Sequence, residues 1–166
     1  MKRLLGFAVI LFIPGAAFSE DAKNLLKPID KESSWRFELH EGAQGALEIV
    51  DKAAVLKAEK LTGTNWHVQA FQVNLDLKDG KEYTLKVTMS APRSRSVLIV
   101  ATIDEEDWHE IGLHEDVRLG KEPKTYEFTF KADGVVANKN RVGFVLGDET
   151  GDVIIKDMTL TEKKKS

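Results

Sequence analysis

The sequence predicts an all-β protein, a β-sandwich jelly roll of two antiparallel sheets. Apolar and polar residues alternate with a period of two in one segment after another, as in Trp35–Leu39, whereas few windows carry the period of a helix. Turn-forming residues separate these segments, for example Lys78-Asp79-Gly80-Lys81. Many short strands with turns between them are typical of a sandwich or jelly roll.

Residues 1–19 have the layout of a secretory signal peptide. Lys2-Arg3 precedes the apolar run Leu4–Ile13, which is shorter than the ~20 residues that a membrane-spanning helix needs. Ala17-Phe18-Ser19 then offers small residues for cleavage before Glu20. A membrane anchor is the less favoured alternative. We therefore expect a secreted or periplasmic protein that is not held by a membrane.

One domain is expected over residues 20–161, with a charged tail at 162–166. Ala53–Lys60 is rich in Ala, Leu, Lys and Glu and could form a short helix, but its position between strand signals favours a strand. The predicted strands are Trp35–Leu39, Ala46–Val50, Ala53–Lys60, Trp66–Leu77, Tyr83–Met89, Ser96–Ile103, Ile111–Leu119, Thr125–Lys131, Arg141–Leu146 and Val153–Thr161.

Two of these strands depart from simple alternation. In Ser96–Ile103 both faces are apolar, which indicates either a strand covered on both sides or the floor of a groove. In the last strand the apolar parity changes between Ile155 and Met158. Keeping both parities in the core requires a one-residue bulge near Lys156-Asp157.

Composition excludes several classes of function. The chain has no cysteine, so it has no disulfide, cysteine-type zinc site or thiol nucleophile. Its net charge is −3 and becomes more negative when Lys2 and Arg3 are removed, which gives no electrostatic reason to bind nucleic acid or anionic lipid. A monomer is expected.

Catalytic motifs are absent from the sequence. There is no nucleophile elbow and no phosphate-binding loop. His109 and His114 are five residues apart, which does not suit two metal ligands on one helix face. The acidic run Asp104–Asp107 could supply catalytic carboxylates or calcium ligands, but a solvated loop is the favoured interpretation.

The three tryptophans of the chain differ in their expected environment. Trp35 alternates with other apolar residues and is expected in the core. Trp66 follows a turn and Trp108 follows the acidic run, so each could either pack inside or lie exposed. An exposed indole beside polar groups suits stacking on the C–H face of a sugar ring.

The chain resembles the carbohydrate-binding modules of the family 4/9 and 22 type. No single segment is specific, but their order and spacing from residue 23 to residue 161 are. The segments that carry the resemblance are Asn24–Lys27, Trp35, Thr64–Gln69, Leu77–Leu85, Ala91-Pro92-Arg93, Trp108, Ile111-Gly112-Leu113, Lys124–Phe130, Val142–Gly147 and Gly151–Leu160.

The resemblance implies a non-catalytic jelly roll that binds a polysaccharide or oligosaccharide in a groove on its concave sheet. By matching positions, Trp66, Gln69 and Trp108 would line that groove, with Arg141 on the outward face of its strand. Gly143 offers no side chain where relatives often place a ligand contact.

The resemblance also implies one structural calcium ion, with Glu32, Asp51 and Asp157 at the matching positions. The usual Asn-Gly-x-Phe-Glu start is replaced here by Pro28–Glu32.

Two alternatives to a glycan-binding function stay open. One is a small glycanase that uses Glu105 or Glu115. The other is a secreted sandwich that binds protein, an option favoured by the lack of an attached catalytic domain.

Overall fold

The computed structural model describes residues 22–164, and the expected signal peptide lies outside this range. The chain forms strands with two short 3-10 turns. In order, the elements are η1 (Glu32–Ser34), β1 (Arg36–Leu39), β2 (Gln44–Val50), β3 (Ala53–Lys60), η2 (Asn65–His67), β4 (Val68–Leu75), β5 (Glu82–Ser90), β6 (Arg95–Ile103), β7 (Glu110–Leu119), β8 (Lys124–Lys131), β9 (Asn140–Val145) and β10 (Gly151–Glu162).

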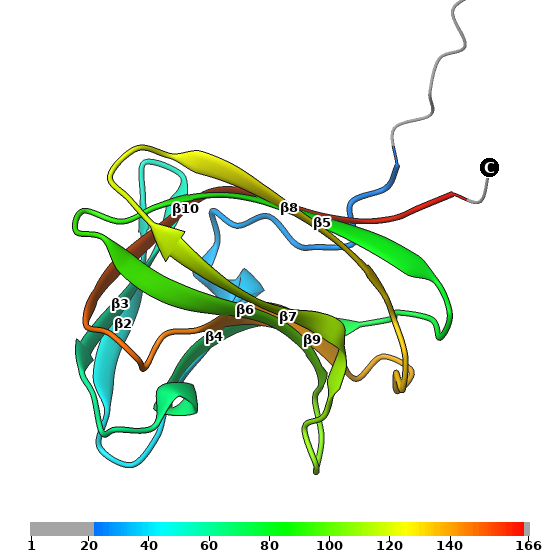
Figure 1. The fold of residues 1–166 in the computed structure, drawn as a ribbon, viewed down its shortest axis with the longest axis horizontal. Helices are drawn as coiled ribbons and strands as arrows, with labels where there is room; N and C mark the ends of the chain where they lie inside the picture. The colour runs from blue at the N-terminus through cyan, green and yellow to red at the C-terminus, as the bar shows by residue number, and fades with distance from the viewer. Residues whose placement is uncertain (1–21, 165–166) are drawn as a thin grey trace, which may run out of the picture.

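The strands form two five-stranded antiparallel sheets that pack face to face (Figure 1). One sheet has the order β1-β4-β9-β6-β7 and is called here the groove sheet, and the other has the order β2-β3-β10-β5-β8. Consecutive strands often belong to opposite sheets, as β1 and β2 do, so the chain crosses repeatedly over the core. The prediction of an all-β sandwich of two antiparallel sheets is confirmed.

The core lies between the sheets and is built from the inward parity of the strands. Leu85, Val87 and Met89 of β5 are all nearly inaccessible to solvent, and they alternate with outward-facing residues. Trp35 is 8% exposed, and its indole Nε1 donates a hydrogen bond to the carbonyl of Ile29 at 3.0 Å. The expectation that Trp35 packs in the core is therefore confirmed.

The change of apolar parity in the last strand has a structural cause. The register of β10 against β5 shifts between Ile155 and Asp157, which is the predicted bulge. Ala53–Lys60 forms strand β3, as predicted. The predicted strand boundaries are less accurate: Trp66 lies in η2 rather than in a strand, and β10 continues to Glu162.

Within residues 22–164 no helix has the length and apolar character needed to cross a bilayer.

Candidate functional site

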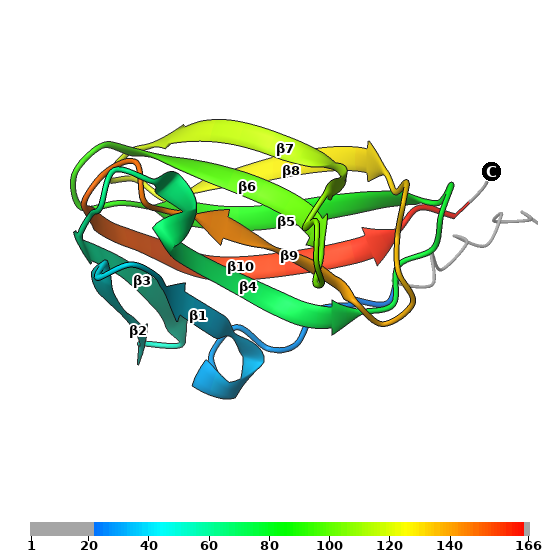
Figure 2. The same cartoon turned by 90° about the horizontal axis from the view of Figure 1, so that it is seen from below.

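A groove of about 600 Å³ lies on the outer face of the groove sheet. Figure 2 looks onto this face, where η2 and the loop between β6 and β7 lie in front of the strands. The register aligns residues in rows across the sheet: Glu38 pairs with Gln69, Gln69 with Val145, and Val145 with Leu98. A ligand lying along such a row would cross the strands.

The floor of the groove is apolar. Phe71, Leu98, Val100 and Val145 form a small buried cluster, separate from the main core and on the opposite face of the sheet. Leu98 and Val100 are the second apolar parity of β6, which explains why that strand is apolar on both sides. Of the two interpretations of Ser96–Ile103, the groove floor is therefore correct.

Trp66 stands on one side of this floor and is 49% exposed. The one-turn η2 lifts its indole away from the sheet, and the His67 ring meets it edge-on with the ring centres 4.2 Å apart. The His67 ring is held by a 2.5 Å contact between Nδ1 and the Thr62 hydroxyl. The backbone N–H of Gly147 also donates to the carbonyl of Asn65, which attaches η2 to the end of β9.

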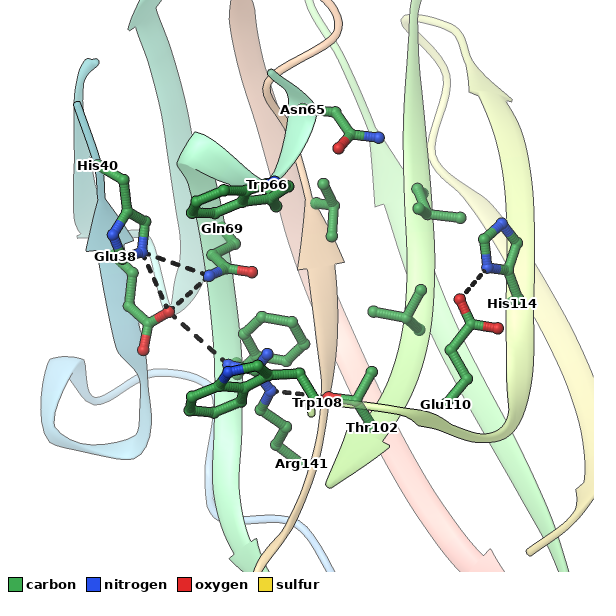
Figure 3. A pocket seen from close by; sticks show the side chains of 14 residues that line it. Glu38, His40, Asn65, Trp66, Gln69, Thr102, Trp108, Glu110, His114 and Arg141 are labelled. Atoms are coloured by element: carbon green, nitrogen blue, oxygen red, sulfur yellow. Dashed lines mark hydrogen bonds and ion pairs between the residues drawn. The ribbon is translucent and has the colours of Figure 1, made fainter. Parts of the chain in front are cut away.

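Trp108 stands on the other side and is 50% exposed. It belongs to the loop between β6 and β7, and Figure 3 shows Gln69 lying between the two indoles. Asp107 and Trp108 both have positive φ, 77° and 49°. Such a conformation is unfavourable for a bulky side chain, and it persists only where the surroundings enforce it. The loop is thus built to present this ring.

Arg141 supports Trp108 from below. Its guanidinium carbon lies 4.0 Å from the centre of the Phe71 ring and 4.8 Å from that of Trp108, so the cation is packed between two aromatic rings. Arg141 Nε donates to the Thr102 hydroxyl at 2.8 Å. Burial lowers the pKa of Arg141, and the Glu38 and Asp104 carboxylates oppose that shift. Only 7% of the Arg141 side chain is exposed.

Glu38 organises the polar side of the groove. Its Oε2 accepts a hydrogen bond from Gln69 Nε2 at 2.6 Å and lies 3.6 Å from His40 Nε2 (Figure 3). Its Oε1 lies 2.6 Å from Arg36 Nε. Because Gln69 donates to Glu38, its carbonyl oxygen is left as an acceptor for a ligand hydroxyl.

The structure brings all four predicted groove residues, Trp66, Gln69, Trp108 and Arg141, around one groove. Their contact with a sugar stays a prediction. Several polar residues that were not predicted also line the groove, namely Glu38, His40, Asn65, Glu110 and His114. Glu38 and His40 have the polar parity of the Trp35–Leu39 alternation, which was the available signal. Their neighbour Gln69 is distant in sequence, so only the strand order reveals the contact.

The acidic run is less solvated than expected. Asp104 accepts a bidentate pair of hydrogen bonds from Arg36, and only 9% of its side chain is exposed. Its interpretation as a solvated loop residue is therefore wrong for Asp104, because strand β1 places Arg36 beside it. Glu105 pairs with Lys139. Neither Glu105 nor Glu115, the carboxylates of the glycanase alternative, lines the groove.

The three proposed calcium ligands lie on separate elements. Glu32 is in η1, Asp51 is in the turn after β2, and Asp157 is at the bulge of β10. Among residues 22–164, no three His, Asp or Glu side chains gather as a set of metal ligands. Calcium binding at Glu32, Asp51 and Asp157 stays a prediction.

Comparison with known families identifies the family to which the chain belongs. The family model described as "Carbohydrate binding domain" (CBM 4/9) matches residues 29–152, a range that contains every residue lining the groove. The chain belongs to this family. The resemblance seen in the sequence is confirmed. No curated protein sequence matches this carbohydrate-binding domain.

Solved structures share the fold of this carbohydrate-binding domain. A CBM4 structure is 19% identical with a TM-score of 0.73, and the match covers 84% of this chain and 97% of that one. The second N-terminal cellulose-binding domain of Cellulomonas fimi β-1,4-glucanase C is 17% identical with a TM-score of 0.68, covering 89% and 99%. A Clostridium thermocellum family 11 module, solved with a β-1,3-1,4-mixed-linked tetrasaccharide, is 11% identical with a TM-score of 0.57, covering 86% and 97%.

Proposed function

We propose that this protein is a secreted, non-catalytic glycan-binding module that holds a β-linked polysaccharide or oligosaccharide in the groove. One observation carries the proposal: two half-exposed indoles, Trp66 and Trp108, flank an apolar floor on the outer face of one sheet. Membership of a carbohydrate-binding family supports it.

The chemistry of the groove suits a pyranose chain. A pyranose in a β-linked chain presents C–H groups on its two faces and hydroxyls around its rim. Indole rings can pack against those faces, and the rim can take hydrogen bonds from polar side chains. Here Trp66 and Trp108 supply the rings, and Gln69, Asn65 and His114 supply polar atoms. The floor of Phe71, Leu98, Val100 and Val145 offers no hydrogen bond, so specificity would come from the walls.

The proposed module performs no hydrolysis. Glycoside hydrolysis needs two carboxyl groups that flank the bond, one of which carries a proton. The groove contains Glu38 and Glu110, which Figure 3 places on opposite sides of it. Each contacts a neighbour: Glu38 accepts from Gln69, and Glu110 Oε1 lies 2.5 Å from His114 Nδ1. Both carboxylates are thus already engaged with neighbouring side chains of the protein rather than poised as a free acid and base.

A glycan array followed by calorimetry with cello-oligosaccharides, mixed-linked β-glucan and xylan tests this function. Binding that is lost in Trp66→Ala and Trp108→Ala supports it. Binding that survives both changes would place the sugar elsewhere. An array without any binding would favour the protein-interaction alternative. Sustained release of reducing sugar, lost in Glu38→Gln or Glu110→Gln, would make the protein an enzyme.

Export is a separate part of the proposal and rests on the sequence of residues 1–19. Mass spectrometry of the protein released from expressing cells is expected to find an N-terminus at Glu20 or within a few residues of it. Recovery of the protein with Met1 intact in a membrane fraction would contradict export.

A further inference from the structure

We propose that His109, in its protonated form, is a positioning residue that clamps the Trp108 loop and makes the groove sensitive to pH. The clamp consists of His109, Asp107 and the carbonyl of Gly134. It deepens the proposed function, because the affected wall is one of the two stacking rings. The clamp itself can be tested without any sugar.

The geometry around the imidazole requires two N–H donors. His109 Nε2 lies 2.7 Å from the carbonyl oxygen of Gly134, and Nδ1 lies 2.7 Å from Asp107 Oδ1. Both partners are oxygen acceptors, whereas a neutral imidazole carries only one N–H. Both contacts can be hydrogen bonds at the same time only when the ring is an imidazolium.

The charges around His109 favour that form. The Gly134 carbonyl and then the Asp107 carboxylate raise the pKa of His109, and Asp133, on the same loop as Gly134, adds to the shift. In return, hydrogen bonds from the backbone N–H and the ring of His109 lower the pKa of Asp107. The backbone bond is 2.9 Å long. These two carboxylates and one carbonyl are the groups that act on the ring, from its own loop and from the loop between β8 and β9.

Gly134 is shaped to receive the ring. A Cβ built on Gly134 would lie only 2.8 Å from His109 Nε2, and its φ of +72° is one that other residues rarely adopt. A side chain here would therefore push the imidazole away from the carbonyl. The close approach is a second sign, independent of charge, that the two loops are fitted to each other.

The clamp acts on Trp108 because the two residues are adjacent in a strained segment. The loop is attached to the end of the β8–β9 loop through Asp104, whose N–H donates to the carbonyl of Lys139 at 2.7 Å, and through the Glu105–Lys139 ion pair. These contacts hold the first half of the loop. The second half, where Asp107 and Trp108 have positive φ, is held by two backbone bonds of 3.0 Å and by the His109 clamp. In those backbone bonds the Trp108 N–H donates to the carbonyl of Glu105, and the Ile103 N–H donates to the carbonyl of His109. Loss of one clamp bond would let that half relax and move the indole.

The pH range follows from the two pKa shifts. Because the pKa of His109 is raised above its ordinary 6.5, the clamp is fully formed below that pH and is lost as pH rises through the folded-state value. Because the pKa of Asp107 is lowered below 3.8, its contribution is lost only in stronger acid. We therefore expect the ring to be held best in mildly acidic solution.

The decisive experiment is an NMR titration of the sugar-free protein that follows the His109 ring and the Trp108 indole N–H. Both signals are expected to change with one midpoint above pH 6.5, and Asp107→Asn is expected to lower that midpoint. Glu122→Gln removes the same charge from an exposed turn and should leave it unchanged. A His109 midpoint at or below 6.5, or a Trp108 signal that ignores it, would overturn the clamp.

Two further variants separate the clamp from the fold and from sugar binding. In Gly134→Ala the His109 ring and the Trp108 indole N–H should no longer change with a common midpoint, while the far-ultraviolet circular dichroism spectrum stays native. If mixed-linked β-glucan binds, its affinity should fall about two- to tenfold above the midpoint, the effect of one lost hydrogen bond, and Asp107→Asn should shift that fall to lower pH. Unchanged affinity across the midpoint would contradict a role for the clamp in binding. Absence of glucan binding would count against the proposed function while the titration still decides the clamp.

Discussion

The guanidinium carbon of Arg141 lies 4.8 Å from the centre of the Trp108 ring, so a buried cation supports an exposed wall of the groove. The same guanidinium packs on Phe71 of the floor, at 4.0 Å. Floor, cation and wall thus form one stack that rises from the sheet. The position of the Trp108 ring is set both by this stack and by its own loop.

Replacement of Arg141 by lysine should weaken glycan binding although it keeps the charge. The ammonium of lysine cannot stack as a flat group between two rings, and it cannot reproduce the geometry of the bond to Thr102. Cation–π contacts are worth about 0.5–2 kcal/mol, which corresponds to a loss of affinity of roughly 2- to 30-fold. Calorimetry with the glycan identified by the array measures this loss of affinity.

Arg118→Lys is the matched control for that change. Arg118 is exposed, pairs with Glu149 and lies outside the groove. Its replacement should leave affinity unchanged. Equal affinities of Arg141→Lys and the unchanged protein would show that the stack does not position the ring.

The three tryptophans should separate into two classes on truncation. Trp66→Ala and Trp108→Ala should cost about 1–3 kcal/mol of binding free energy, judged by stacking on other flat ligands. They should cost little stability, since a half-exposed ring leaves no cavity. Trp35→Ala should instead cost about 3–5 kcal/mol of unfolding free energy, because it empties a core site.

Urea unfolding and calorimetry on the same three variants make the comparison. Native-like affinity in the Trp66 and Trp108 variants would move the sugar out of the groove. A large loss of stability in Trp66→Ala would instead assign that ring to the fold, through its edge-on contact with His67.

The sequence predicted which face of a strand each residue occupies better than it predicted which strands lie side by side. Alternation gave the outward position of Gln69, and the two apolar faces of β6 gave the groove floor as one of two interpretations. Both signals are local, since each depends on residues two apart. The contacts between Gln69 and Glu38 and between Arg36 and Asp104 join segments that are distant in sequence. Alternation carries no information on strand order, so these contacts appear only in the fold.

Calcium binding is tested by thermal unfolding. A ligand that binds only the native state adds about 2.7 kcal/mol at a hundredfold excess over its Kd, which for a domain of this size would raise Tm by several degrees. If Asp157 is a ligand, as the family resemblance implies, Asp157→Asn should abolish the difference between calcium and chelator. Identical melting curves for the unchanged protein would exclude a stabilising calcium.

Gly143 should be the glycine of the groove sheet that is least tolerant of a side chain. It lies in β9, between β4 and β6, where a Cβ would come 2.0 Å from the carbonyl oxygen of Ala70 and 2.8 Å from Cδ1 of Phe71. The missing side chain at this position therefore reflects the close approach of the β4 backbone together with the Phe71 ring. The Phe71 ring that fills this space is the base on which Arg141 stacks.

Gly143→Ala should thus lower both stability and affinity. Strands β4 and β9 would have to separate, at a cost of about 1–3 kcal/mol or more for an overpacked site, and the displaced Phe71 would shift Arg141 and with it Trp108. Gly120→Ala is the control, because Gly120 is exposed and a Cβ there meets no atom within 4 Å. Urea unfolding and calorimetry should show a change in Gly143→Ala alone. A variant at Gly143 with native stability and affinity would contradict the account of a floor packed against Phe71.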